Sequence, residues 1–175
     1  MKYKIVTSKI SKEATLNNLS RNLNLQSEIY ALSDGEIYLG AISNKTLALF
    51  AVEFAEYALQ NYEKERIPEA EICISLMRKW LRDDTSVSKE ELKAAADAAY
   101  ATTYGYGDAY AVYAAFYAAT FPVYSINPAD ATSYSANAAT DAAAYAAGKS
   151  KEEEYQRQGN FIIDFLKSGN HLFLA

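Results

Sequence analysis

A block of 55 consecutive residues, 94–148, contains no lysine and no arginine, and this bias restricts the possible folds more than any other feature. It holds 22 of the chain's 31 alanines and 9 of its 15 tyrosines, and its four acids are Asp97, Asp108, Asp130 and Asp141. Alanine is the strongest helix former, so the bias favours packed helices over disorder. Residues 1–93 and 149–175 are close to neutral, so nearly all of the net charge of −5 comes from this block.

Start and stop signals predict six helices after residue 46. Ser88 followed by Glu91 is a capping box, and Ser150 followed by Glu153 is another. Six helices with short connections predict an antiparallel bundle. The other signals are Leu47 and Tyr62 for the ends of the first helix, Pro68 for the start of the second, Tyr104 for the end of the third, Asp108 and Pro122 for the cap and stop of the fourth, and Pro128 for the start of the fifth.

The first 46 residues follow a different pattern. Tyr3 and Ile5 alternate with polar residues, as in a short strand, and an Asp34-Gly35 pair lies between the β-prone runs 29–32 and 36–42, which predicts a hairpin. We therefore expect a mainly α fold, an antiparallel multi-helix bundle with a small N-terminal strand and hairpin appendage. The expected units are an α/β appendage over residues 1–46 and an Ala/Tyr-rich helical bundle over residues 47–175.

Apolar residues at helical spacing predict the core. On the second helix the expected buried stripe is Ile72, Cys73, Leu76 and Trp80. The main core is expected to contain Trp80, Phe50, Phe54, Leu76 and Ile162.

The tyrosines and aspartates of the block form stripes along three helices. At 100° per residue, the fourth helix places its tyrosines opposite a seam of alanines, and the third and fifth each place aspartate and tyrosine on one face. Two interpretations stay open: an interior in which tyrosine hydroxyls donate to the aspartates, or a surface for a basic protein partner. The partner-binding candidates are Asp97, Tyr100, Tyr104, Tyr106, Asp108, Asp130, Tyr134 and Asp141.

Residue inventory disfavours most catalytic chemistry. His171 and Cys73 are the only residues of their types, which argues against di-iron and zinc sites, and no phosphate-binding Gly-rich motif is present. Glu53 and Glu56 lie one helical turn apart and could serve as an acid/base pair, but the solvated face of a helix is the favoured interpretation. We expect no enzymatic activity, no cofactor and no metal.

The composition also bears on partners and on location. A net negative charge argues against a nucleic-acid partner. The uncharged run Ala109–Ala129 is broken by Pro122 and Pro128, so we expect no membrane span. The single cysteine favours a reducing compartment, and we expect a cytoplasmic protein. The oligomeric state stays open.

Several separated segments carry a family resemblance. They are the stretch Leu47–Glu56, the Arg66-Ile67-Pro68 start, Trp80, the Ala/Tyr/Asp-rich block and the run Glu154–Gln158. Together they resemble the alanine-rich immunity proteins encoded beside bacterial polymorphic toxins, over about residues 47–167. This chain departs from the pattern at Arg66-Ile67-Pro68, where the family tends to have Arg-Pro, and at Phe54, where cysteine is common.

The resemblance implies a non-enzymatic binding protein of the immunity or inhibitor type, which neutralises a toxin or effector by direct contact. Two other hypotheses stay open. One is an inhibitor of a host defence complex, encoded by a phage or mobile element, which would use the same surface. The other is a small-molecule enzyme that uses Glu53, Glu56 or the Asp/Tyr stripes in a cleft between helices.

Overall fold

The computed structural model describes residues 2–6, 11–15, 29–33, 36–40, 43–63, 66–104, 109–146 and 148–168. Over these ranges the protein is mainly α-helical, as predicted, with six helices that form a bundle. The helices are α1 (Asn44–Asn61), α2 (Pro68–Arg82), α3 (Lys89–Thr102), α4 (Tyr110–Tyr124), α5 (Pro128–Ala146) and α6 (Lys151–Lys167). The strands are β1 (Lys2–Val6), β2 (Ser11–Thr15), β3 (Ile29–Ser33) and β4 (Glu36–Gly40).

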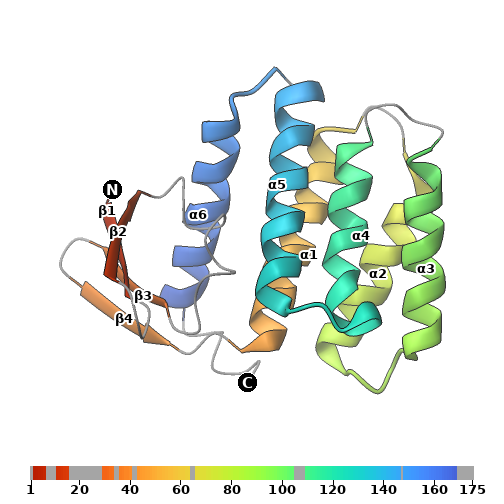
Figure 1. The fold of residues 1–175 in the computed structure, drawn as a ribbon, viewed down its shortest axis with the longest axis horizontal. Helices are drawn as coiled ribbons and strands as arrows, with labels where there is room; N and C mark the ends of the chain where they lie inside the picture. Colours follow the sequence, from red (N-terminus) through yellow and green to blue (C-terminus); the bar gives the residue numbers. More distant parts are fainter. Residues whose placement is uncertain are drawn as a thin grey trace.

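The helices form two layers (Figure 1). Helices α5, α4 and α3 lie side by side in the front layer, and α1 and α2 lie behind them. Helix α4 is the central element, since it contacts α1, α2, α3 and α5. Helix α6 packs on the other side of α5, next to the strands. Among the described helices, α4 has neighbours behind it and at both sides but none in front of it.

Small residues allow the two layers to approach closely. Ala111, Ala114, Ala115 and Ala118 of α4 are at most 1% exposed. The hydroxyl of Ser135 on α5 donates to the carbonyl of Ala51 on α1 at 2.8 Å and lies 3.1 Å from the carbonyl of Ala114 on α4. Such short side chains let helix axes approach the lower end of their usual separation. The predicted alanine seam of the fourth helix is confirmed.

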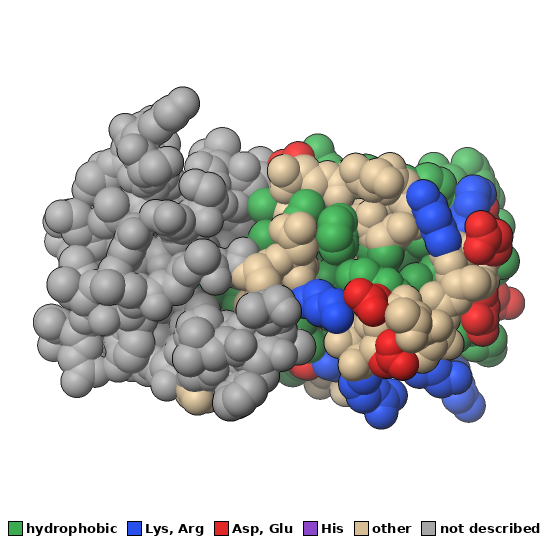
Figure 2. All heavy atoms as spheres, turned by 90° about the horizontal axis from the view of Figure 1, so that it is seen from below, with side chains coloured by type: hydrophobic (Ala, Val, Ile, Leu, Met, Phe, Trp, Pro, Cys, Tyr) green, Lys and Arg blue, Asp and Glu red, His purple; other side chains and the backbone are tan. Residues whose placement is uncertain are grey.

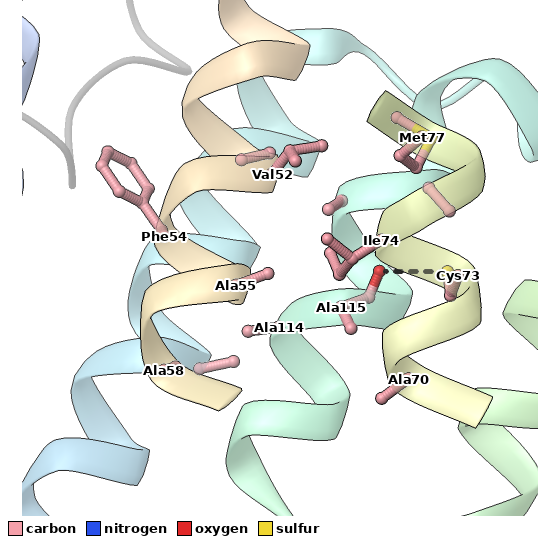
Figure 3. Packing of buried hydrophobic residues seen from close by; sticks show 14 of the residues in the cluster. Val52, Phe54, Ala55, Ala58, Ala70, Cys73, Ile74, Met77, Ala114 and Ala115 are labelled. Carbon is pink, nitrogen blue, oxygen red and sulfur yellow. Dashed lines mark hydrogen bonds between the residues drawn. The ribbon is translucent and has the colours of Figure 1, made fainter. Parts of the chain in front are cut away.

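Apolar side chains pack on both sides of α1 (Figure 3). Val52 and Ala55 point toward α2 and α4, whereas Phe54 leaves α1 on the opposite side. There its ring meets Phe161 of α6 edge-on, with the ring centroids 6.2 Å apart. Phe50, Phe54, Leu76 and Ile162 are all buried, as predicted.

The prediction for α2 is wrong at two positions. Ile72 is 55% exposed, and Trp80 is half-buried at the rim, where it meets Phe121 edge-on. The buried side of α2 consists of Ala70, Cys73, Ile74, Met77 and Leu81, with Leu76 beside them. The stripe is therefore rotated relative to the predicted one, because α2 packs against α1, α3 and α4 together.

Capping residues fix three of the six helix starts, those of α3, α5 and α6, where they were predicted. Ser88 Oγ accepts from the Glu91 amide, and Asn127 Oδ1 accepts from the Ala129 amide at the start of α5. Ser150 and Glu153 form a reciprocal capping box: Ser150 Oγ accepts from the Glu153 amide at 3.2 Å, and the Glu153 carboxylate accepts from the Ser150 amide at 3.3 Å.

Both ends of α4 differ from the prediction. Its N-cap is Ala109, with no side-chain hydrogen bond, and the predicted cap Asp108 lies outside the described residues. Pro122 does not stop the helix, which continues to Tyr124 and ends at Ser125 in the left-handed conformation, φ 57°. The Ser125 amide donates to the Phe121 carbonyl, so the last turn closes one residue beyond the helix.

The strands form two antiparallel pairs. β1 pairs with β2, and β3 pairs with β4 with Ser33 opposite Glu36. The predicted Asp34-Gly35 turn lies outside the described residues, and the division into an appendage and a bundle stays a prediction.

Candidate functional site

Helix α4 separates its small and large side chains onto opposite sides. Its alanines are buried, whereas its tyrosines and Phe116 are half-buried or exposed at the surface. Rings from α3 and α5 flank them on both sides. We call this surface the aromatic face, and it consists of Tyr100, Tyr104, Tyr110, Tyr113, Phe116, Tyr117, Tyr124, Tyr134 and Tyr145.

The rings of the aromatic face contact one another across three helices. Tyr100 of α3 packs against Phe116 of α4, with ring centroids 4.8 Å apart, and meets Tyr104 edge-on at 5.7 Å. Tyr117 of α4 packs against Tyr134 of α5 at 5.5 Å. Such contacts orient rings without burying them: Tyr104 stays 81% exposed and Tyr134 48% exposed.

An ion pair marks each edge of the aromatic face. At the α3 edge, Asp97 accepts from Lys93 Nζ at 2.5 Å and also from the Tyr124 hydroxyl. These two donors, Lys93 first, lower the pKa of the Asp97 carboxyl below its ordinary value. At the α5 edge, Asp141 accepts from Lys151 Nζ, also at 2.5 Å. Both lysines lie outside the cation-free block, and they neutralise two of its four acids.

A shallow groove of about 270 Å³ lies between α4 and α5 on this face. Tyrosine rings form most of its walls, and Asp141 places a carboxylate at its edge. We call it the α4–α5 groove, and it is lined by Tyr110, Tyr113, Tyr117, Tyr134, Asn137, Ala138 and Asp141.

The structure places the predicted site residues as follows. Tyr100 and Tyr104 lie at the α3 side of the aromatic face, and Tyr134 and Asp141 line the α4–α5 groove. Asp130 is half-buried in the first turn of α5. Asp97 lies at the α3 edge, and Tyr106 and Asp108 lie outside the described residues.

The structure has one feature of each interpretation of the Asp/Tyr stripes: a tyrosine–aspartate hydrogen bond and a set of exposed tyrosines. The Tyr124–Asp97 bond has the chemistry of the interior interpretation but is exposed. The sequence indicated the stripes, but it did not reveal that Tyr110, Tyr113, Phe116 and Tyr117 belong to the same surface.

A buried polar cluster lies between α1 and α6, and no sequence pattern predicted it. The Glu154 carboxylate is buried and accepts from the Tyr62 hydroxyl at 2.6 Å, from two nitrogens of Arg157 and from Gln158. The Arg157 guanidinium also lies 3.5 Å from the ring centroid of Tyr57. A buried carboxylate needs this many donors, so the cluster holds α6 against α1.

The acid pair Glu53 and Glu56 has a structural partner. Arg78 of α2 donates to Glu53 at 2.6 Å and to Glu56, and all three side chains are about two-thirds buried. The interpretation of Glu53 and Glu56 as part of a solvated helix face is therefore wrong. The two glutamates join α1 to α2 through Arg78. These ion pairs occupy Glu53 and Glu56, one of the two sets of acids that the enzyme hypothesis names; the other is the Asp/Tyr stripes.

Other reactive groups are enclosed or dispersed. Burial raises the pKa of the Cys73 thiol to about 12, and the thiol donates to the Ala115 carbonyl. Within the described ranges, histidine, cysteine, aspartate and glutamate do not gather in groups of three or more that could hold a metal ion. None of the helices described is long and apolar enough to span a bilayer.

The end of the bundle shown in Figure 2 contrasts with the aromatic face. Lysine, arginine, aspartate and glutamate side chains gather toward α2 and α3 in this view. The ion pair Lys45–Asp84, at 3.5 Å, joins the start of α1 to the α2–α3 connection. Charges of both signs are mixed there, as on an ordinary solvated surface.

Comparison with protein-family models, with curated proteins and with solved structures found no match to this chain.

Proposed function

We propose that the protein is a non-enzymatic binding protein of the immunity or inhibitor type, which neutralises a basic protein partner by covering it with the aromatic face. The resemblance to alanine-rich immunity proteins leads to the same class. The observation that carries the proposal is the set of exposed or half-buried tyrosines of α4 and its neighbours, whose rings contact one another.

The chemistry of the face supports a protein partner. Tyrosine supplies a large contact area and a hydroxyl at little cost in conformational entropy, and it is enriched at interfaces. Five of the six exposed large hydrophobic residues in the described ranges lie on this one face: Tyr100, Tyr104, Tyr124, Tyr134 and Tyr145. Ring-to-ring contacts already fix several of these side chains, which lowers the entropy lost on binding.

The charge of the face supports a basic partner. Its helices hold no lysine or arginine between residues 94 and 148, and the ion pairs at its edges are exposed. Exposed pairs contribute little to stability, so a cation of the partner can replace Lys93 or Lys151 at small cost.

Photo-crosslinking tests the location of the surface. A photoreactive amino acid at Tyr104 is expected to capture a protein in the source cells. The same group at Ile72, which is 55% exposed on α2 in the other layer, is the matched control. Capture from Ile72 and not from Tyr104 would place the interface on the other layer and contradict the proposal.

Affinity measurements with the captured partner test the contribution of the rings. Tyr100→Ala with Tyr104→Ala is expected to cost about 2 kcal/mol or more of binding free energy, as central aromatic contacts do. Ile72→Ala, the control, is expected to leave the dissociation constant unchanged. Melts followed by circular dichroism show whether each variant is folded.

A further inference from the structure

We propose that the α4–α5 groove receives an arginine side chain of the partner, with its guanidinium stacked on tyrosine rings and its N–H groups donated to Asp141. This inference rests on the proposed function and specifies the chemistry of its partner. The relevant parts are the tyrosine walls, the carboxylate at the edge and the lack of a cation in block 94–148.

The geometry of the groove suits a planar cation. The rings of Tyr113 and Tyr117 are nearly parallel, 26° apart with centroids 6.5 Å apart, and the ring of Tyr134 is tilted against Tyr117. Their π faces carry partial negative charge and attract a cation that lies within about 6 Å of a ring centroid. Asp141 adds a full negative charge within reach of the same space.

The protein already uses this combination once. Arg157 stacks on the ring of Tyr57 at 3.5 Å while its Nε and Nη2 donate to Glu154 at 2.9 and 2.6 Å. The groove presents the same two chemical groups, tyrosine rings and a carboxylate, to the outside. An arginine of the partner would thus make the same two contacts in the groove, with a tyrosine ring and with a carboxylate, that Arg157 makes within the protein.

Arginine fits the groove better than lysine does. Its guanidinium is planar, weakly hydrated and able to donate two parallel hydrogen bonds to one carboxylate, whereas the ammonium of lysine is a strongly hydrated point charge. Lys151 now holds Asp141, but its side chain is 55% exposed. The incoming guanidinium therefore displaces an exposed ion pair and not a buried one.

Short capped peptides test the inference without the partner. The probes are acetyl-Gly-Arg-Gly-amide and the same peptide with lysine or with citrulline, which keeps the shape of arginine but has no charge. Binding is followed by NMR of the tyrosine ring signals. We expect saturable shifts at Tyr113, Tyr117 and Tyr134 with the arginine peptide, an affinity at least threefold lower with lysine, and no saturation with citrulline.

Three variants assign the contacts. Asp141→Asn is expected to lower the affinity for the arginine peptide at least threefold, whereas Asp84→Asn, at an exposed carboxylate paired with Lys45 away from the aromatic face, leaves it unchanged. Lys151→Gln is expected to raise the affinity, because it removes the competing cation. Equal binding of all three peptides, or equal losses with Asp84→Asn and Asp141→Asn, would overturn the inference.

The peptide test and the partner test fail separately. If Tyr100 and Tyr104 bind the partner but the arginine peptide produces no saturable shift, the groove inference is wrong and the proposed function stands. If the peptide binds but crosslinks form at Ile72 and not at Tyr104, the proposed function is wrong and the groove is an arginine site without that role.

Discussion

The hydroxyl of Tyr62 donates to the buried carboxylate of Glu154 at 2.6 Å, across 92 residues of sequence. Tyr62 directly follows α1 and Glu154 lies in the first turn of α6, so this bond joins the end of one helix to the start of another. Arg157 neutralises the same carboxylate from the next turn of α6.

Glu154→Gln is expected to lower the free energy of unfolding by about 2–3 kcal/mol, because it leaves Arg157 without its charge partner in a largely buried site. Urea denaturation at neutral pH measures the change. Glu152→Gln removes an exposed carboxylate from the same helical turn and is expected to change stability by less than about 0.5 kcal/mol. Similar costs for the two variants would show that the cluster does not hold α6 in place.

Burial, and then the hydrogen bond to Glu154, raise the pKa of the Tyr62 hydroxyl well above its ordinary value of about 10. The folded state therefore keeps a proton that the unfolded chain loses near pH 10. The resulting stability is fully present below pH 10 and is lost as the pH rises above it.

Tyr62→Phe is therefore expected to flatten the alkaline fall in the free energy of unfolding between about pH 9.5 and 11.5. Urea denaturation at several pH values measures the slope. Tyr104→Phe, at a ring that is 81% exposed, is the matched control. An alkaline slope that Tyr62→Phe leaves unchanged would contradict the role of this proton.

Phe54→Ala is expected to cost about 3–5 kcal/mol of unfolding free energy, as truncation of a fully buried phenylalanine does. Trp80→Ala is expected to cost less, because half-buried Trp80 packs at the rim against Phe121. Chemical denaturation of both variants gives the comparison. A larger loss for Trp80→Ala would place the centre of the core nearer α2 than the structure does.

Local signals predicted the helices because each signal acts within one turn. Ser88, Ser150 and Asn127 cap helices through bonds to residues two or three positions away, so the sequence alone contains both partners. The mainly α class and the alanine seam of α4 follow from composition and spacing in the same way. The signals for α4 are exceptions, since its N-cap is Ala109 and not Asp108 and the helix continues for two residues beyond Pro122.

The remaining features depend on contacts between residues that are far apart in the sequence, and local patterns do not predict such contacts. The apolar residues of α2 extend around more than one side, so the choice between Ile72 and Ile74 depends on three neighbouring helices. Likewise, Arg78 reaches Glu53 from another helix, and Lys151 reaches Asp141 from outside the cation-free block. Counting charges along the chain could not show that these acids are paired.

Charge reversal at Asp97, Asp108 and Asp141 together tests whether the Asp/Tyr stripes bind a partner or hold the interior. Asp97 and Asp141 are roughly half exposed and make exposed ion pairs, so their replacement by lysine is expected to move the melting temperature by only a few degrees. Association with a basic partner is expected to slow strongly. Its rate should then rise with salt instead of falling, because the reversed charges repel a basic partner and salt screens that repulsion.

The outcomes of this experiment separate the two interpretations because stability and binding are measured on the same variant. An almost unchanged circular-dichroism melt with slowed association supports a binding surface, as the exposure of both carboxylates leads us to expect. A collapsed melt supports the interior interpretation, in which the Tyr124–Asp97 bond stabilises the contact between α3 and α4. If both the melt and the association rate stay unchanged, the steering charges lie elsewhere, and Glu53 and Glu56, once freed from Arg78 by Arg78→Met, are the next acids to test.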